Sequence, residues 1–260
     1  MRIDDLFDYF ELRTVTKNPF EIIRFRKCRD PQAELKVCFR EGPPLFLRGD
    51  HADFHTFHRI FLRDEYRLEG LKTKPQVVLD LGGNVGLFAA RIAAECTKLI
   101  ICEPIPDNIE RLKKNTAGHE NVVIIEKAVT SSVGTLNLYL PKSAKASDAF
   151  SSFGDNDLLT EECLEVETTS LEQIFKEQRL EKVDLLKIDI EGSEYEVVHA
   201  STELLARIQS IHGEYHDVSP EDPRTRIDHF TKFLEDNGYS VLVEPHLKHP
   251  NKGMFYATRN

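Results

Sequence analysis

Apolar runs alternate with segments of helical period over most of the chain. From Val77 onward, runs rich in Val, Ile and Leu are separated by stretches in which apolar residues recur three or four positions apart. This alternation is typical of βαβ units, whose parallel strands are buried on both faces and so read as unbroken apolar runs. The pattern predicts an α/β fold with a doubly wound, seven-stranded, mostly parallel sheet. The predicted strands are Val77–Leu81, Lys98–Cys102, Val122–Ile125, Val183–Ile188, Ile208–Glu214, Ser240–Val243 and Met254–Ala257.

Helical periodicity fills the connections between these strands. Leu87–Glu95 and Asn108–Lys114 are predicted helices, the second starting at Pro106 and Asp107, which suit a helix N-terminus. A third predicted helix, Arg226–Asn237, precedes the last two strands. Those strands are joined by a Pro- and His-containing loop, which predicts a terminal antiparallel hairpin.

Two regions depart from the βαβ pattern. Residues 1–72 do not show this alternation, and we expect a hairpin around Glu41–Pro44 and a helix from Asp53 to Tyr66. We expect them to form an N-terminal α+β cap on a domain of residues 73–260. The connection Lys127–Lys182 is too long for one crossover helix and contains an alternating segment, Thr135–Leu140. A lid over the substrate and a solvated decoration are both open interpretations of this insertion.

Composition and charge narrow the class of partner. The chain has 260 residues, 40% of them apolar and 30% charged, as in an ordinary globular protein. Its formal net charge of -10 argues against nucleic acid as a partner, because nucleic-acid-binding surfaces are usually basic. The N-terminal residues lack a signal-peptide layout and no segment approaches the roughly 18 apolar residues of a membrane span, so we expect a cytoplasmic protein with no membrane partner.

The segment Val77–Gly86 joins an apolar strand to a glycine-rich turn and then a helix. Gly82 and Gly86 lack Cβ atoms that would block a nucleotide-like ligand. The spacing is not the G-x-G-x-x-G of dinucleotide-binding proteins, and the carboxylate of Asp80 would repel a pyrophosphate. A carboxylate suits a cationic ligand instead, and S-adenosylmethionine carries both an ammonium and a sulfonium group. We therefore expect this cofactor.

Two further predicted strands end at acidic residues. Glu103 ends the strand after the glycine turn, where a carboxylate can accept hydrogen bonds from both ribose hydroxyls. NAD-binding folds use the same arrangement, so Glu103 indicates an adenosine-type ligand without choosing the cofactor. Asp189 ends a strand expected to flank the change of strand order, where ligands bind in open α/β sheets. It could orient the cofactor, act as a general base or bind a metal. Glu191 is interpreted as a charge at a helix start.

The segment His212–His216 is the remaining candidate for chemistry. Strand alternation places His212, Glu214 and His216 on one face. Glu214 and His216 could deprotonate an acceptor hydroxyl, or could hold a divalent cation with Asp189. A histidine at a strand end is also often a structural hydrogen-bonding residue.

These residues together resemble one family. The chain is similar to FkbM-type methyltransferases in a match that spans about two thirds of its length. Four motifs carry this similarity: Asp80–Gly86, Glu103-Pro104 followed by Leu112 and Asn115, Ala128-Val129, and Lys187–Glu194. Looser matches are Asp53–Tyr66 and Ser151-Ser152. Two departures are between small residues, Gly83 where the family prefers Ala and Ala200 where it often has Gly. Seven strands ending in an antiparallel hairpin are the usual layout of this Rossmann-like class I methyltransferase fold.

The resemblance implies O-methylation with S-adenosylmethionine as the methyl donor. The residues expected at the cofactor are Asp80, Gly82, Gly83, Asn84, Gly86, Glu103, Pro104, Ala128 (in the adenine pocket) and Asp189. The expected catalytic residues are Asp189, Glu214 and His216, and no metal ligand is assigned. Family members differ in acceptor, including macrolides and sugars, so we expect a small-molecule or carbohydrate acceptor without naming it. Assembly of the chain into a homo-oligomer is also compatible with the sequence.

Two other functions share part of this pattern. An NAD-dependent oxidoreductase or epimerase would also have the strand, glycine turn, helix and distal acid, although Asp80 and the missing third glycine argue against it. A non-catalytic module could keep the cofactor fold without the chemistry. The intact acidic strand ends argue against that interpretation.

Overall fold

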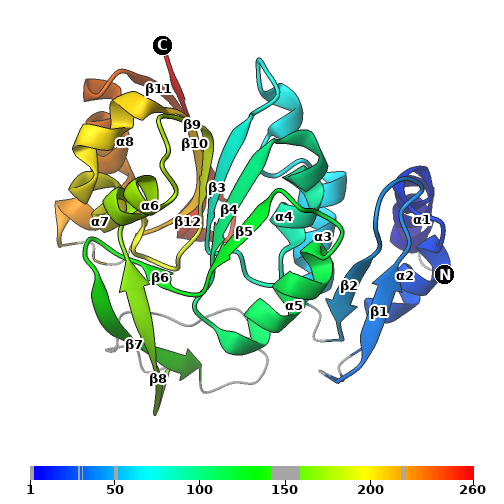
Figure 1. Cartoon of the computed structure of the whole chain (residues 1–260). Coiled ribbons are helices and arrows are strands. Elements are labelled where there is room, and N and C mark those ends of the chain that lie inside the picture. The colour runs from blue at the N-terminus through cyan, green and yellow to red at the C-terminus, as the bar shows by residue number, and fades with distance from the viewer. Residues whose placement is uncertain are drawn as a thin grey trace.

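A seven-stranded sheet forms the centre of the molecule (Figure 1). A computed structural model describes residues 3–28, 30, 32–49, 52–141, 159–217, 219 and 221–260. The strand order is β11-β12-β10-β9-β3-β4-β5, and only β12 runs antiparallel to its neighbours β10 and β11. The predicted fold class is confirmed. The strands are β3 (Val77–Leu81), β4 (Lys98–Cys102), β5 (Val122–Ile125), β9 (Val183–Ile188), β10 (Ile208–His216), β11 (Tyr239–His246) and β12 (His249–Arg259).

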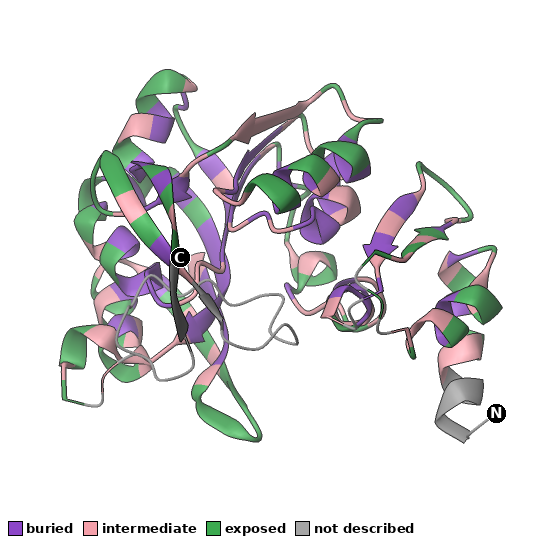
Figure 2. Cartoon of the chain, turned by 90° about the horizontal axis from the view of Figure 1, so that it is seen from below, coloured by how far each residue is buried: buried purple, intermediate pink, exposed green. Residues whose placement is uncertain are grey.

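Helices cover both faces of this sheet (Figure 1). One face packs against α6 (Leu171–Glu177), α7 (Glu194–Ala200) and α8 (Ile227–Asp236). The other face packs against α3 (Ala52–Leu62), α4 (Leu87–Ile92) and α5 (Pro106–Thr116). Side-chain alternation along each strand supplies both cores, and the central strands are accordingly buried (Figure 2). Short 3-10 helices occupy Leu68–Gly70, Ala93–Glu95, Thr202–Arg207 and Pro223–Thr225.

The N-terminal segment packs on the α3 and α4 side of the sheet. It contains α1 (Ile3–Val15), α2 (Pro19–Phe25) and the antiparallel pair β1 (Glu34–Val37) and β2 (Leu45–Arg48), which confirms the expected hairpin. Its buried apolar residues belong to the same cluster as residues of β3 and α4. The division into a cap of residues 1–72 and a domain of residues 73–260 remains a prediction.

The long insertion after β5 forms a second small sheet. Its strands β6 (Ala128–Val129), β7 (Gly134–Pro141) and β8 (Leu159–Thr169) pair in the order β6-β8-β7, below the main sheet in Figure 1. Residues 142–158, which include Ser151 and Ser152, lie outside the described residues. Ala128 and Val129 open the insertion and lie next to the carboxyl ends of the main strands.

Element boundaries differ from the sequence-based expectation most clearly at α3 and at the terminal hairpin. Helix α3 ends at Leu62, so Tyr66 lies in the loop that follows it. The terminal hairpin is longer than predicted, because β11 and β12 continue through the expected loop and pair His246 with His249. Backbone pairing across this hairpin overrides the turn signal of its Pro and Gly residues.

Among the described residues, no helix combines the length and the apolar character that crossing a bilayer requires.

The α3 core gives a direct test of this packing. Phe57 on α3 is fully buried, whereas Phe20 on α2 is 59% exposed. We expect Phe57→Ala to lower the free energy of unfolding by about 3–5 kcal/mol, because it leaves a cavity in the core. Phe20→Ala should change it by less than about 0.5 kcal/mol. Urea denaturation of both variants measures the difference, and equal effects would contradict the assigned core.

Candidate active site

The site forms where the strand order reverses. Strand β3 is followed in the chain by β4 and β5 on one side of it, whereas its other neighbour, β9, is followed by β10 on the opposite side. The loops that leave β3 and β9 therefore diverge and open a crevice between them. The two loops are joined at the base of the crevice, where the Asp189 N–H donates to the carbonyl oxygen of Leu81 at 3.0 Å. This joint fixes Asp189 beside the glycine turn.

The glycine turn is shaped by close backbone approach. Gly82 has φ +87°, and a Cβ atom there would overlap the carbonyl oxygen of Asp189. The N–H groups of Gly82 and Gly83 both donate to the Cys102 carbonyl at 3.0 Å, which ties the turn to β4. Gly86, also at positive φ, packs against Leu112 of α5 and lines neither of the two cavities at the site. Gly86 therefore serves helix packing, and its predicted contact with the cofactor is not supported by this placement.

Glu103 lies where the sequence placed it, at the carboxyl end of β4. Its carboxylate is 3% exposed and accepts hydrogen bonds from the Asn84 N–H (2.8 Å), the Ile105 N–H (3.0 Å) and the Asn108 side-chain amide (3.2 Å). Burial raises the pKa of Glu103, while the bonds from Ile105, Asn108 and Asn84 act to lower it. The carboxylate is thus held in one orientation at the edge of the crevice.

A first cavity lies between the main sheet and the insertion. It spans about 740 Å³ of empty space, part of which is open to solvent. Six residues of the predicted cofactor set line it: Gly82, Asn84, Glu103, Pro104, Ala128 and Asp189. Apolar side chains of the insertion, Val129, Leu136 and Leu138, form another part of the wall, and residues that follow β4 and β9 complete it. An apolar pocket with a few fixed polar groups is the usual form of a small-ligand site.

A second cavity lies on the α3 side of the glycine turn. It spans about 1470 Å³ of empty space, part of which is open to solvent, and its wall includes His55, Thr56 and Arg59 of α3. Tyr66, Lys187, Glu214 and Lys252 also line it, so polar and charged groups stand beside apolar ones on its surface. Gly82, Asn84, Asp189 and Glu191 line both cavities. The two cavities therefore meet beside Asp189.

Asp80 has a different partner from the one expected. Its carboxylate is fully buried, lines neither cavity and lies 3.0 Å from the Lys187 ammonium. Lys187 also donates to the carbonyl oxygens of Leu81 (3.4 Å) and Gly82 (2.6 Å). Burial acts to lower the pKa of Lys187, but Asp80 and Asp189 raise it overall, so the ammonium stays charged. The cation that Asp80 binds is internal, and direct contact with a cofactor is not supported.

His216 is placed at the site but not as a base. Its Nδ1 lies 3.2 Å from a Glu194 carboxylate oxygen, and its Nε2 lies 3.5 Å from Glu191 and 3.8 Å from Glu214. Burial acts to lower the pKa of His216, but Glu194 and Glu191 raise it to about 10. The imidazole is therefore already protonated at neutral pH and has no capacity to take a proton. The expected role of His216 as a base is not supported, and its charge instead balances the surrounding carboxylates.

Donor atoms of Asp189, Glu214 and His216 lie within 4.8 Å of one another, as the alternation along β10 predicted. Cations of the protein already occupy this cluster. Glu214 pairs with Arg59 (3.4 Å) and Lys252 (3.3 Å), in addition to the charged His216. Because these groups already compensate the carboxylates, we assign no metal ion here. His212 does not join the cluster; its Nδ1 lies 2.7 Å from the Tyr66 carbonyl oxygen.

The loop after β9 also differs from expectation. Glu191 has φ +53° and faces His216, so it is not a charge at the start of α7. Glu194 is fully buried and accepts hydrogen bonds from the N–H groups of Ile190 (2.9 Å) and Gly192 (3.0 Å). Glu194 therefore holds the loop that carries Asp189 and Glu191. Asp189 keeps its predicted place, because it lines both cavities.

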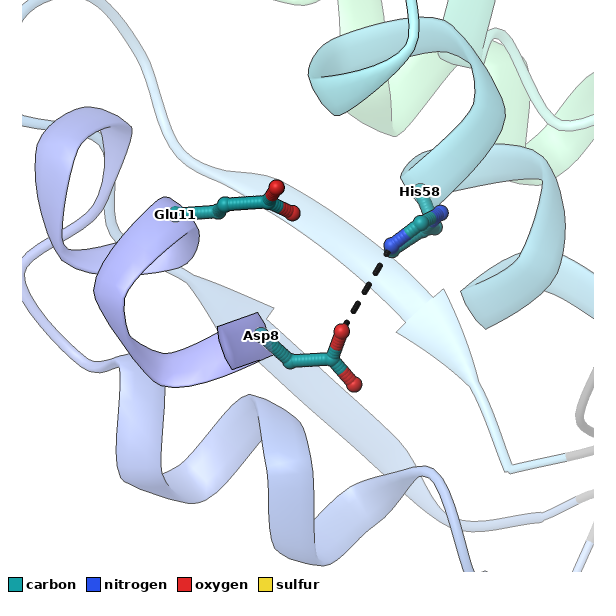
Figure 3. Close-up of side chains that lie close together, drawn as sticks. All are labelled: Asp8, Glu11 and His58. Carbon is teal, nitrogen blue, oxygen red and sulfur yellow. Dashed lines mark ion pairs between the residues drawn. The ribbon is translucent and has the colours of Figure 1, made fainter. Parts of the chain in front are cut away.

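A second acidic and histidine cluster, Asp8, Glu11 and His58, lies between α1 and α3 and lines neither cavity (Figure 3). Asp8 is 3.8 Å from His58 and 2.7 Å from Arg26, and Glu11 is 3.0 Å from Arg63. Burial and the neighbouring Arg63 lower the pKa of His58, so this imidazole is neutral at neutral pH. The cluster joins helices by ion pairs and is structural.

The fold and crevice define a class I methyltransferase architecture, and comparison with known proteins gives the family. Residues 80–241 match the family described as Methyltransferase FkbM domain. The chain belongs to this family, as the sequence motifs indicated. A solved FkbM methyltransferase from Methylobacillus flagellatus shares the fold, with a TM-score of 0.52 and 10% identity over 98% of this chain and 59% of that one.

Curated relatives are distant in sequence. The hexuronic acid methyltransferase AglP of Haloferax volcanii is 28% identical over 56% of this chain and 59% of its own length. The 31-O-demethyl-FK506 methyltransferase FkbM of Streptomyces tacrolimicus is 23% identical over 76% of this chain and 85% of its own. The chain spans only 11% of the AMB antimetabolite synthetase AmbE of Pseudomonas aeruginosa, to which it is 24% identical.

Several site residues were missed in the sequence. Lys187 carried a signal, because a lysine inside an apolar strand is rarely buried without a carboxylate partner. Arg59 and Tyr66 lay within a loose family match, which gave no role to either. Lys252 lay in the expected loop of the hairpin, and nothing local linked it to Glu214. Its position depends on the pairing of β12 with β10.

The buried Asp80–Lys187 pair can be tested by a double-mutant cycle. We expect Asp80→Asn to lower the free energy of unfolding by about 3–5 kcal/mol, because Lys187 would be left charged and unpaired in the core. Adding Lys187→Met should restore much of this loss, because no buried charge then remains. Chemical denaturation measures all three variants. If the double variant is less stable than Asp80→Asn by the full cost of Lys187→Met alone, the pair does not interact as described.

Proposed function

We propose that this chain is an S-adenosylmethionine-dependent methyltransferase that methylates a hydroxyl oxygen of a small molecule or sugar. The observation that carries the proposal is the meeting of the two cavities at Asp189 and the glycine turn. The first cavity would take the cofactor and the second the acceptor. Family membership argues against the oxidoreductase alternative.

The residues of the first cavity fit the proposed cofactor. Glu103 presents a fixed carboxylate for ribose hydroxyls, and apolar side chains of the insertion would cover the adenine. The side-chain oxygen of Asn84 is buried and has no hydrogen-bond partner among the described residues. Asn84 lines both cavities, and its side-chain oxygen would accept a hydrogen bond from the cofactor ammonium. The carboxylate of Asp189 suits a sulfonium cation.

In the proposed reaction, the protein places the methyl donor and the acceptor and takes up one proton. S-adenosylmethionine, when bound, supplies an activated methyl group on its sulfonium. The two cavities would hold donor and acceptor side by side, so proximity and orientation supply most of the acceleration. Asp189 would accept the hydroxyl proton, with Glu214 as the remaining expected base. Glu214 is less suited, because Arg59 and Lys252 already hold its carboxylate.

The acceptor class is supported by the second cavity and by the relatives. Its wall offers hydrogen-bond donors and acceptors such as His55, Thr56 and Arg59, which suit a hydroxylated molecule. The FkbM relative is named for methylation at an oxygen, and AglP for methylation of a sugar acid. These names are the support for O-methylation in this chain.

Cofactor binding is tested without an acceptor. We expect saturable binding of S-adenosylmethionine and S-adenosylhomocysteine by isothermal calorimetry. Glu103→Gln should weaken both by at least about tenfold, because a neutral amide replaces the charged acceptor of the ribose hydroxyls. Glu126→Gln, at an exposed glutamate paired with Lys113, is the control and should leave both affinities unchanged. Absence of binding to the unaltered protein would overturn the proposed function.

The base is tested by turnover. We expect Asp189→Asn to lower kcat by about 10²–10⁴-fold with an acceptor found by screening methyl glycosides and hydroxylated macrolides, because the proton loses its acceptor. Formation of S-adenosylhomocysteine measures the rate. Full turnover in this variant would show that Asp189 is not the base. A protein that binds the cofactor but methylates no acceptor would favour the non-catalytic alternative.

A further inference from the structure

Tyr66 makes an unassigned contact at the proposed reacting centre. Its hydroxyl donates a hydrogen bond to Oδ2 of Asp189 at 3.2 Å. Among the residues that the structure describes, Tyr66 alone donates a hydrogen bond to the Asp189 side chain. Tyr66 is 4% exposed and lines the second cavity. A residue from the N-terminal third of the chain thus contacts the carboxylate at the end of β9.

The Tyr66 side chain is itself held from several sides. Its backbone carbonyl lies 2.7 Å from Nδ1 of His212 on β10. Its ring meets Phe88 of α4 edge to face, with ring centres 5.1 Å apart, and the Lys187 ammonium lies 5.8 Å from the ring centre. These contacts fix the ring between the two sides of the strand reversal. Its hydroxyl therefore has a defined position before any ligand binds.

The hydroxyl acts as a donor and not as a base. Burial, and then the charges of Asp189 and Glu65, raise the pKa of Tyr66 well above its ordinary value. The phenol therefore stays protonated under all ordinary conditions. A donor to the ionised form of a carboxylate stabilises that form and limits its rotation.

We propose that Tyr66 is a positioning residue for Asp189: its hydroxyl fixes Oδ2 and so leaves Oδ1 to receive the proton of the acceptor. This inference rests on the proposed function, because it takes Asp189 as the base. The loop after α3, which carries Tyr66 and precedes the glycine turn in the chain, thereby takes part in catalysis. A base held in one rotamer before the acceptor arrives needs no reorganisation during the reaction.

Other charged groups surround Asp189 and would remain in a variant of Tyr66. They lie on α3 and the loop after it, on β9 and the loop after it, and on β3, β10 and β12. They are Arg59, Glu65, Lys187, Glu191, Asp80, Glu214, His216 and Lys252. Since Tyr66→Phe leaves all of them in place, it isolates the hydroxyl.

The test measures kcat and the KM of the acceptor for Tyr66→Phe, with the acceptor used for Asp189→Asn and with formation of S-adenosylhomocysteine as the readout. We expect kcat to fall by about tenfold while KM and the affinity for S-adenosylmethionine stay within about twofold, because the hydroxyl acts only on the placement of the base. A purely structural loss would lower the affinity for the cofactor as well. Tyr239→Phe removes another buried hydroxyl, bonded to the Leu205 and Ile208 carbonyls, and should leave kcat unchanged.

The outcomes separate this inference from the proposed function. Full turnover in Asp189→Asn would overturn the proposed base and with it this inference, while cofactor binding and turnover by the unaltered protein would still support the proposed function. If Asp189→Asn loses turnover but Tyr66→Phe keeps its kcat, or loses cofactor affinity together with kcat, Tyr66 is structural and the positioning role is wrong.

Discussion

The ion pair between Asp80 and Lys187 is the interaction on which the site depends. It joins the two strands that flank the strand reversal, β3 and β9, at the level where both end. A buried charge pair is a weak source of stability compared with apolar packing, but its geometry is demanding because each partner is costly to leave alone. Lys187 adds bonds to two carbonyl oxygens of the glycine turn, so one cation sets the position of the turn and of the loop that carries Asp189.

A second layer of charge compensation surrounds the point where the cavities meet. The carboxylates there are balanced by Arg59, Lys252 and a protonated His216, which come from three separate parts of the chain. Because these cations come from the protein, Glu214 and Glu191 can lie close together without a bound metal. Asp189 has an uncharged partner, Tyr66, and differs in this way from the other carboxylates.

The sequence predicted the fold well because its strands are buried on both faces, and such strands leave an unambiguous apolar pattern. Glu103 and Asp189 were also predictable, since both end a strand at a known edge of the sheet. Asp80 was misread because sequence spacing does not show which residue lies across a strand pair. The charge state of His216 depends on Glu194 and Glu191, which only the loop after β9 brings to it. Tyr66 and Lys252 required tertiary contacts over long sequence separations.

The two cavities share their floor but not their walls. The first cavity is bounded by the insertion after β5, and the second by α3 and the loop that follows it. Under the proposed function, substitutions at the α3 residues that line the second cavity would alter the shape offered to an acceptor without touching the first cavity. Such a division would let acceptor preference change while the reaction is retained, with Tyr66 as the point on that wall that is least free to change.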